Sequence, residues 1–288
     1  MNDLRRELAV SKSIEHLLVA RNLRGMQSVQ SSLKPGYCLR AARRLLSCSG
    51  RVLIGTGFPV LDTFESDGPA GAIALYRVLE QTGAEPILVC GDVLANAIGG
   101  DYCVERVPLG RPAGLRQQVA DLLAYCQPEL MVSIELPGPA ADGHYYNMRG
   151  EDINSSTLCF DVFLELSDCP VIALGDGGNE IGMGNVLDKL GELTIIPSIT
   201  TCDELVIADV SNWAALGLVA MMSYCVGTDY LADWDNRAIL EYLACRGSID
   251  GVTLDNTLTE DGLPSETGKA LVNSLRDLID VSSVEGSG

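Results

Sequence analysis

The sequence has few positive charges for its length. Lys and Arg together number 20 in 288 residues, against 39 Asp and Glu, and the formal net charge is −19. Nucleic acids and anionic membranes are bound by clustered Lys and Arg that neutralise phosphate, so the composition argues against both as partners. A small anionic substrate would therefore have to meet a local positive element: a bound divalent metal, a helix N-terminus or a placed arginine.

The sequence also lacks the spacing of a zinc or redox site. It has two histidines, and its ten cysteines include no Cys-x-x-Cys pair, which excludes zinc ribbons and dithiol redox motifs. Cysteines within apolar segments, such as Cys90 after Ile87-Leu88-Val89, behave as small hydrophobes under reducing conditions. The first seven residues are rich in charged side chains, and no run of 18 apolar residues occurs. We therefore expect a cytoplasmic protein with no signal peptide and no membrane span.

Short apolar runs alternate with helical patterns along most of the chain. With 47% hydrophobic residues, the chain can bury a large core. Strands are predicted at residues 52–54, 86–89, 103–107, 130–134, 171–174 and 205–208, with a further candidate at 251–254. Helices are predicted at residues 69–82, 113–126, 155–166, 181–190, 211–226, 236–245 and 265–279. This alternation predicts an α/β fold with a mostly parallel, doubly wound sheet in three αβα layers.

The N-terminal segment has a different pattern. Residues 3–24 carry leucines and isoleucine at helical spacing, which predicts an amphipathic helix. A second helix is expected after Pro35, because the fixed φ of proline suits a first helical turn. We predict an N-terminal helical arm at 1–48, which packs on the main domain or on a second copy in a homo-oligomer, and one α/β domain at 49–288. Residues 282–288 are expected to form a frayed tail.

The most informative segment is the glycine-rich loop at 175–184, Gly-Asp-Gly-Gly-Asn-Glu-Ile-Gly-Met-Gly. It directly follows the apolar run at 171–174, and ligands of open α/β sheets bind at the carboxyl ends of the strands. Glycines let backbone N–H groups approach a ligand closely. Asp176 and Glu180 offer hard oxygen atoms for Mg²⁺, Mn²⁺ or a substrate amine. A helix C-cap and turn with solvated acids is the alternative.

A second loop follows the strand at 52–54. Its Gly55-Thr56-Gly57 is half of a dinucleotide fingerprint, but Val60 stands at the third glycine position, so we do not expect NAD. Glu65 and Asp67 lie just before Pro69, which suits a helix start. Asp67 is therefore either a helix N-cap or a metal or substrate ligand.

Two more loops carry polar groups after predicted strands. In the loop at 142–152, Arg149 is suited to bind a carboxylate in bidentate fashion, or else pairs with a neighbouring acid. His144 is a candidate general base or simply an exposed residue.

In the loop at 208–213, Ser211 or Asn212 would cap the following helix, whose N-terminus could bind an anionic oxygen.

Together these loops resemble the D-glutamate cyclase family. The segments that carry the likeness are Thr56-Gly57-Phe58, 65–71, 142–150, 176–184 and Ser211-Asn212-Trp213, within about residues 50–245. The resemblance is to the C-terminal domain of the longer two-domain cyclases, which also occurs as a stand-alone protein. In the family pattern Glu135 is often followed by arginine, whereas here Leu136 follows it, which removes one possible carboxylate clamp.

The resemblance implies a lyase that converts D-glutamate to 5-oxo-D-proline and water. A carboxylate-held Mn²⁺ or Mg²⁺ would make the γ-carboxylate electrophilic and bind the departing oxygen. The metal ligands would be Glu65, Asp67, Asp176 and Glu180, and the catalytic residues Glu135, Asp176 and Glu180. The substrate, a small anion, would be bound by Thr56, Gly57, Tyr145, Asn147, Arg149, Gly177, Gly178, Asn179, Ser211 and Asn212. Two other functions use the same residue types: a metal-dependent phosphatase acting on a small phosphate ester, and a non-catalytic module that binds an acidic metabolite.

Overall fold

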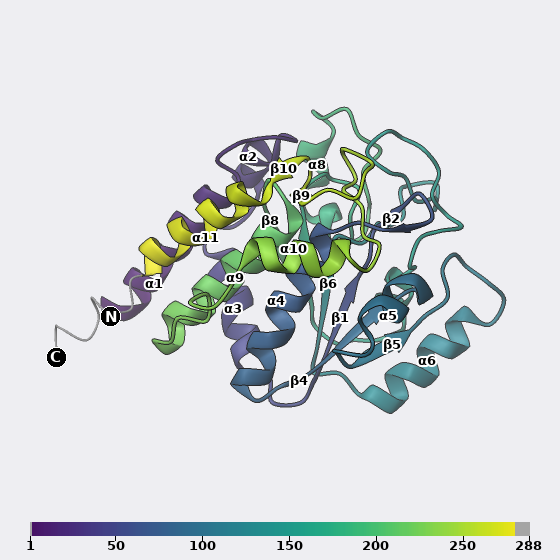
Figure 1. Cartoon of the computed structure of the whole chain (residues 1–288), viewed down its shortest axis with the longest axis horizontal. Coiled ribbons are helices and arrows are strands. Elements are labelled where there is room, and N and C mark those ends of the chain that lie inside the picture. The colour runs from purple at the N-terminus through teal and green to yellow at the C-terminus, as the bar shows by residue number, and fades with distance from the viewer. Residues whose placement is uncertain (1, 280–288) are drawn as a thin grey trace.

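A sheet of six parallel strands forms the centre of the molecule (Figure 1). The structure is a computed structural model and describes residues 2–279. The strands are β1 (Arg51–Thr56), β4 (Glu85–Cys90), β5 (Val104–Arg106), β6 (Leu130–Ile134), β7 (Val171–Gly175) and β8 (Glu204–Ile207). They lie in the order β5-β4-β1-β6-β7-β8. The six strands predicted between residues 52 and 208 are therefore confirmed.

The strands are apolar on both faces because helices cover both sides of the sheet. Every residue of β6 and β7 is buried, which is typical of parallel strands between two helical layers. β1 pairs with β4 on one side and with β6 on the other, so that Val52 stands between Pro86 and Leu130.

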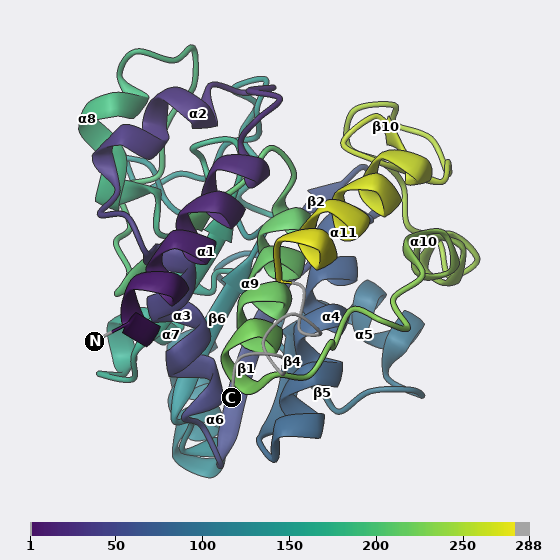
Figure 2. The same cartoon turned by 90° about the vertical axis from the view of Figure 1, so that its left-hand side faces the viewer.

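One face of the sheet carries a double layer of helices. α9 is buried from Ser211 to Ser223, because the sheet lies on one side of it and α1 and α11 lie on the other (Figure 2). α6 and α7 pack together on the opposite face, where right-handed crossovers place them. The predicted three-layer fold is confirmed. These helices are α1 (Asn2–Leu18), α3 (Tyr37–Leu46), α4 (Asp67–Thr82), α6 (Leu115–Cys126), α7 (Asp161–Leu166), α9 (Ser211–Val226) and α11 (Ser265–Ile279).

Shorter elements connect the layers. They are α2 (Met26–Val29), η1 (Gln30–Ser32), α5 (Asp92–Ile98), η2 (Met183–Val186), α8 (Leu187–Leu190) and α10 (Asn236–Ala244), with the hairpins β2 (Pro59–Val60)–β3 (Thr63–Phe64) and β9 (Thr259–Glu260)–β10 (Leu263–Pro264). The sequence did not predict α5 or the two hairpins. Their apolar runs are too short for periodicity to identify.

Three predicted elements of the main domain are wrong in extent or type. The segment 251–254 is a turn rather than a strand, because the Asp250 carboxylate accepts hydrogen bonds from the amides of Val252 and Thr253. The helix predicted at 155–166 is reduced to α7. The helix predicted at 181–190 is a 3₁₀ turn followed by the single turn α8.

The N-terminal segment packs on α9, a helix of the main domain. α1 ends at Leu18, before the predicted residue 24. The backbone leaves the helix there because the Asp209 carboxylate accepts hydrogen bonds from the amides of Arg21 (2.7 Å) and Leu23 (3.1 Å). α3 begins at Tyr37 after Gly36 in a left-handed conformation, so Pro35 lies outside its first turn. α1 and α3 both contact α9, and whether this segment also forms a homo-oligomer remains a prediction.

Within residues 2–279, none of the helices is both long and apolar enough to cross a membrane. The ten cysteines are all free thiols. The tail predicted at 282–288 lies outside the described residues.

Candidate active site

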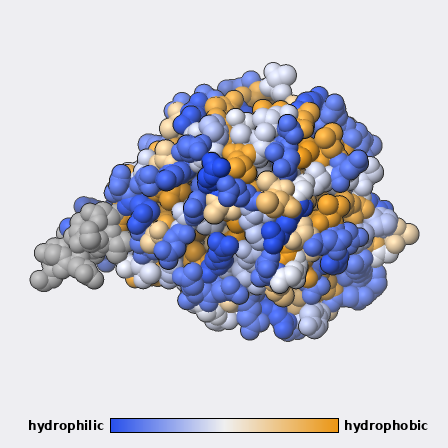
Figure 3. Space-filling model, viewed as in Figure 1, coloured by the Kyte–Doolittle hydropathy of each residue, from blue (hydrophilic) through white to orange (hydrophobic). Residues whose placement is uncertain are grey.

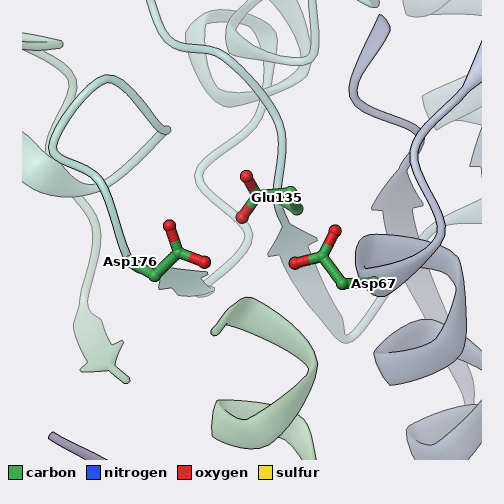
Figure 4. Close-up of side chains that lie close together, drawn as sticks. All are labelled: Asp67, Glu135 and Asp176. Carbon is green, nitrogen blue, oxygen red and sulfur yellow. The ribbon is translucent and has the colours of Figure 1, made fainter. Parts of the chain in front are cut away.

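The strand order of the sheet reverses direction between β1 and β6. Numbered along the chain, the six strands lie in the order 3-2-1-4-5-6, and in such sheets ligands bind in the crevice where the order reverses. Three carboxylates meet there. Asp67 stands in the first turn of α4, Glu135 follows β6, and Asp176 follows β7; each offers an oxygen within 4.8 Å of the others (Figure 4).

The local backbone aims Glu135 into this cluster. Its φ of +52° lies in the left-handed region, which non-glycine residues adopt at some cost and mostly at functional sites. The facing position on α4 is Gly68, where an added Cβ would lie 2.9 Å from Glu135 Cβ. Glycine at 68 therefore allows the Glu135 side chain to reach the start of α4.

The three carboxylates are buried and only partly satisfied. Both side-chain oxygens of Asp67 and Oδ2 of Asp176 have no hydrogen-bond partner within residues 2–279. Ser211 Oγ donates to Glu135, and Arg24 donates to the other oxygen of Asp176. The N-termini of α4 and α9 both begin at this edge, and their dipoles favour negative charge there.

Burial sets the protonation of these acids. Loss of hydration raises the pKa of Asp67 and of Glu135 well above the ordinary range, and the neighbouring carboxylates raise both further. Burial raises the pKa of Asp176 to about 6, although Arg24 opposes this shift. In the absence of a cation, these acids therefore bind protons more readily than ordinary carboxylates do.

Two further acids and one arginine complete the charged interior. Glu65 is buried, accepts the amide of Gly251 at 2.9 Å, and has its pKa raised well above normal, first by burial and then by Asp261. Asp261, in the β9–β10 turn, pairs with Arg24. Arg24 thus joins Asp176 and Asp261, which lie in separate parts of the chain.

A cavity of about 540 Å³ opens above the cluster. Its lining includes the acids Glu65, Glu135 and Asp261. It also includes two positively charged residues, Arg24 and Arg149. Asn147 and Asn179, both predicted to bind substrate, also line this cavity. Arg149 Nη2 donates to Gly251 O at 3.3 Å, and no ion pair of Arg149 occurs in the described chain.

Glu180 needs a correction. We expected it to be a catalytic residue and a metal ligand, but its Oε1 accepts the amides of Asp176 (2.9 Å) and Gly177 (2.6 Å), and its Oε2 accepts that of Gly178 (2.7 Å). The amides of Gly177 and Gly178, which we expected to bind substrate, donate to Glu180 in this structure. The glycine-rich loop therefore binds the side chain of its own Glu180. Gly178 adopts a φ of +106° in this turn, which glycine tolerates.

Tyr145 is also placed differently from the prediction. Its side chain is buried, and its hydroxyl donates to Asp161 (2.7 Å) and accepts from Arg111 (2.7 Å). It therefore ties the 142–152 loop to α7 and does not face the cavity. His144 is exposed and bonds to Asp152 at 2.8 Å, which leaves it away from the cluster.

The remaining predicted substrate ligands lie around the cluster. Thr56 Oγ1 is buried at the end of β1, with no hydrogen-bond partner in the described residues, and Gly57 follows it. Ser211 Oγ donates to Glu135, and Ser211 is not an N-cap, since that position is Val210. Asn212 donates to Glu260, while its Oδ1 lacks a described partner.

Sequence reasoning missed Arg24 and Asp261. Arg24 lies in the segment assigned to a helical arm, and Asp261 lies in a hairpin that was not predicted. The one local signal is the string Glu260-Asp261-Gly262, two acids before a glycine, where Asp261 adopts a φ of +53°.

Known proteins resemble this chain over most of its length. The family model described as D-glutamate cyclase-like, C-terminal, matches residues 14–276. The chain is 31% identical over 217 residues to the human (Homo sapiens) protein named D-glutamate cyclase, mitochondrial; the match covers 65% of this chain and 35% of that protein. An exopolyphosphatase-related protein from Bacteroides fragilis has a solved structure with a TM-score of 0.43 and 11% identity, covering 85% of this chain and 57% of that one. The match of the family model over most of the chain shows that it belongs to the D-glutamate cyclase-like family.

Proposed function

We propose that this protein closes D-glutamate to 5-oxo-D-proline and water with the help of a bound Mn²⁺ or Mg²⁺. The name of the human relative supports the reaction class. The observation that carries the proposal is Asp67, a buried carboxylate beside Glu135 and Asp176 with neither oxygen bonded in the described residues. Burying unpaired carboxylate oxygens is costly, and a bound cation offsets that cost.

Asp67, Glu135 and Asp176 are the residues that we assign to the cation. Three carboxylates form a hard oxygen set that suits Mg²⁺ or Mn²⁺. When bound, the ion supplies Lewis acidity that makes a carboxylate electrophilic and stabilises departing oxygen. Glu180 is left out of the set because its carboxylate holds three backbone amides.

Glu65 is our candidate for the group that takes the proton of the substrate amine. It lines the cavity, and its position two residues before Asp67 keeps it beside the cluster. Burial raises its pKa above that of an ordinary glutamate, which makes its carboxylate a stronger base.

Arg149 is our candidate for the residue that binds the α-carboxylate. It lines the cavity, and within the described chain its guanidinium makes one long hydrogen bond, to Gly251 O. Its planar donors match a carboxylate. Arg24 is already engaged by Asp176 and Asp261, and we assign it to holding those acids in place.

The test is mass spectrometry of 5-oxoproline after incubation with D-glutamate or L-glutamate, each with Mn²⁺ and with EDTA. Metal-dependent product from the D-enantiomer supports the proposal. A panel of phosphate esters under the same conditions tests the phosphatase alternative. Thermal stabilisation by D-glutamate without product would favour a binding module and overturn the proposed catalysis.

A further inference from the structure

A second cavity adjoins the one above the acid cluster. Its volume is about 240 Å³, and it shares Pro59, Leu61 and Ser156 with the main cavity. The other walls are formed by the ends of β1 and β4 and by α5. These walls include Gly57, Gly91, Val93 and Leu94. Phe64 of β3 and the loop residue Leu109 also line the space, as do the polar residues Asp62, Thr63 and Ser155 at its edge. We refer to this space as the side cavity.

The β2–β3 hairpin separates the two cavities, and its tip is unusual. Leu61 is 69% exposed and has a φ of +51°. The tip of a two-residue hairpin with positive φ is normally occupied by Asn, Asp or Gly. A leucine there is unfavourable both in its backbone conformation and in its exposure to water.

Leu61 is one of three exposed hydrophobic residues around the side cavity. Val93 on α5 is 46% exposed, and Leu109 is 37% exposed. Figure 3 shows hydrophobic residues exposed on the right-hand part of this face, where Figure 1 places β2 and α5. Leu109 is held close to the end of β4, since an added Cβ at Gly91 would lie 2.6 Å from it.

We propose that the side cavity binds an apolar group carried by the substrate. The preferred substrate would then be an acidic amino acid that bears an apolar substituent, with its acidic head in the main cavity. This inference rests on the proposed function, because that function places the acidic head. Because Pro59, Leu61 and Ser156 line both cavities, we assign the occupant of the side cavity to the same molecule.

The sizes of the cavities support this substrate class. Pockets of roughly 300–1,000 Å³ hold drug-sized ligands, and the main cavity alone is about 540 Å³, more than one free amino acid requires. An apolar cavity of about 150 Å³ takes a benzene ring, so the side cavity, at about 240 Å³, has room for a phenyl group.

The experiment uses acids that lack an amine and therefore cannot close a ring. Glutarate, 2-benzylglutarate and glutarate monobenzyl ester are titrated calorimetrically into the full chain with saturating Mn²⁺. We expect one benzyl compound to bind at least about 10-fold more tightly than glutarate, from burial of the ring. In Val93→Asn and Leu109→Asn the ratio of the two affinities should fall toward one. Val226→Asn is the matched control, since Val226 is 44% exposed at the far end of α9, and it should keep the wild-type ratio.

Turnover of D-glutamate, measured on the same preparation, separates the two hypotheses. If D-glutamate is cyclised but neither benzyl compound binds more tightly than glutarate, the side-cavity inference is wrong and the proposed function stands. A preference that survives both Asn substitutions overturns the inference as well, and so does a lack of binding by all three acids. Benzyl preference without turnover supports the side cavity and contradicts the cyclase reaction.

Discussion

The floor of the crevice and the loop at its rim are both rich in polar side chains. The two regions differ in how many of these side chains have hydrogen-bond partners. In the rim loop, residues 142–154, Asp142 accepts hydrogen bonds from the hydroxyl of Tyr146 (2.7 Å) and the amide of His144 (3.0 Å), and all three residues are at least partly exposed. On the floor, formed by Asp67, Glu135 and Asp176, the oxygens of Asp67 are buried with no partner in the described residues. Polar density alone therefore does not mark a site, whereas a cluster of buried and unsatisfied carboxylate oxygens calls for an explanation such as a bound cation.

The pKa values of the acids are also shifted in opposite directions in the two regions. The hydrogen bond from Tyr146 lowers the pKa of Asp142, and the Asn154 amide lowers that of Asp152. Burial raises the pKa of every acid on the floor. The rim loop thus stabilises its own charges, while the floor needs a cation or protons from outside.

The largest expected effect comes from removing one floor carboxylate. Asp67→Asn should weaken Mn²⁺ binding and cut cyclase activity by on the order of 100-fold or more, because even residues that only support metal ligands cost about 10–100-fold when changed. The same change at the rim, Asp142→Asn, should alter both by less than about threefold. Mn²⁺ titration and product formation are the measurements, and equal losses in the two variants would show that the floor has no special role.

Two arginines that line the same cavity allow a second test. Arg24 forms ion pairs with Asp176 and Asp261, whose carboxylates are buried. Breaking a buried pair typically costs about 3–5 kcal/mol, so metal-free Arg24→Gln should unfold at a markedly lower temperature. Arg149→Gln should change stability by less than about 0.5 kcal/mol and instead raise the KM for D-glutamate.

Mn²⁺ should restore part of the stability of Arg24→Gln, since it replaces the lost positive charge. Thermal unfolding with and without the metal measures both effects. A wild-type melting temperature for metal-free Arg24→Gln would mean that the ion pairs contribute no stability.

The sequence predicts the floor better than the residues that hold it. The strands at 130–134 and 171–174 place Glu135 and Asp176 at the same sheet edge by a local pattern. Arg24 reaches Asp176 and Asp261 across 152 and 237 residues of sequence, and no local pattern encodes such a contact. The role of Glu180 escaped prediction because spacing does not show that a carboxylate turns back onto amides two to four residues away.

The substitution Gly68→Ala should disturb the floor without unfolding the protein. The new Cβ would lie 2.9 Å from Glu135 Cβ and 3.0 Å from Thr56 Oγ1, so Glu135 must move. Misplacing a reacting group by about 1 Å can cost on the order of 100-fold in rate, while alanine favours the helix. Gly100→Ala is the control, because a Cβ at Gly100 meets no atom within 4 Å. We expect a loss of activity for Gly68→Ala alone, at unchanged far-UV circular dichroism; full activity would show that the crowding is relieved without moving Glu135.

The dependence of stability on pH should have opposite sign in the two regions. An unfolded Asp ionises near 3.8, whereas in the folded chain burial raises the pKa of Asp176 to about 6 and that of Asp261 to about 7. Between roughly pH 4 and 7 the folded state therefore binds more protons, and the metal-free protein should lose stability as the pH rises through this window. The rim acids, whose pKa values are lowered, lose their contribution only as the pH falls below about 4.

Melting temperatures of the metal-free protein at pH 5, 6, 7 and 8 test this slope, at roughly 2–4 °C per kcal/mol for a domain of this size. Asp261→Asn should flatten the part of the slope near pH 7, because it removes the acid that titrates there. Saturating Mn²⁺ should flatten or reverse the slope, since the ion binds the ionised floor and competes with protons. A metal-free melting temperature that rises from pH 5 to 7 would contradict this prediction, and would mean that the floor carboxylates are better compensated than their burial implies.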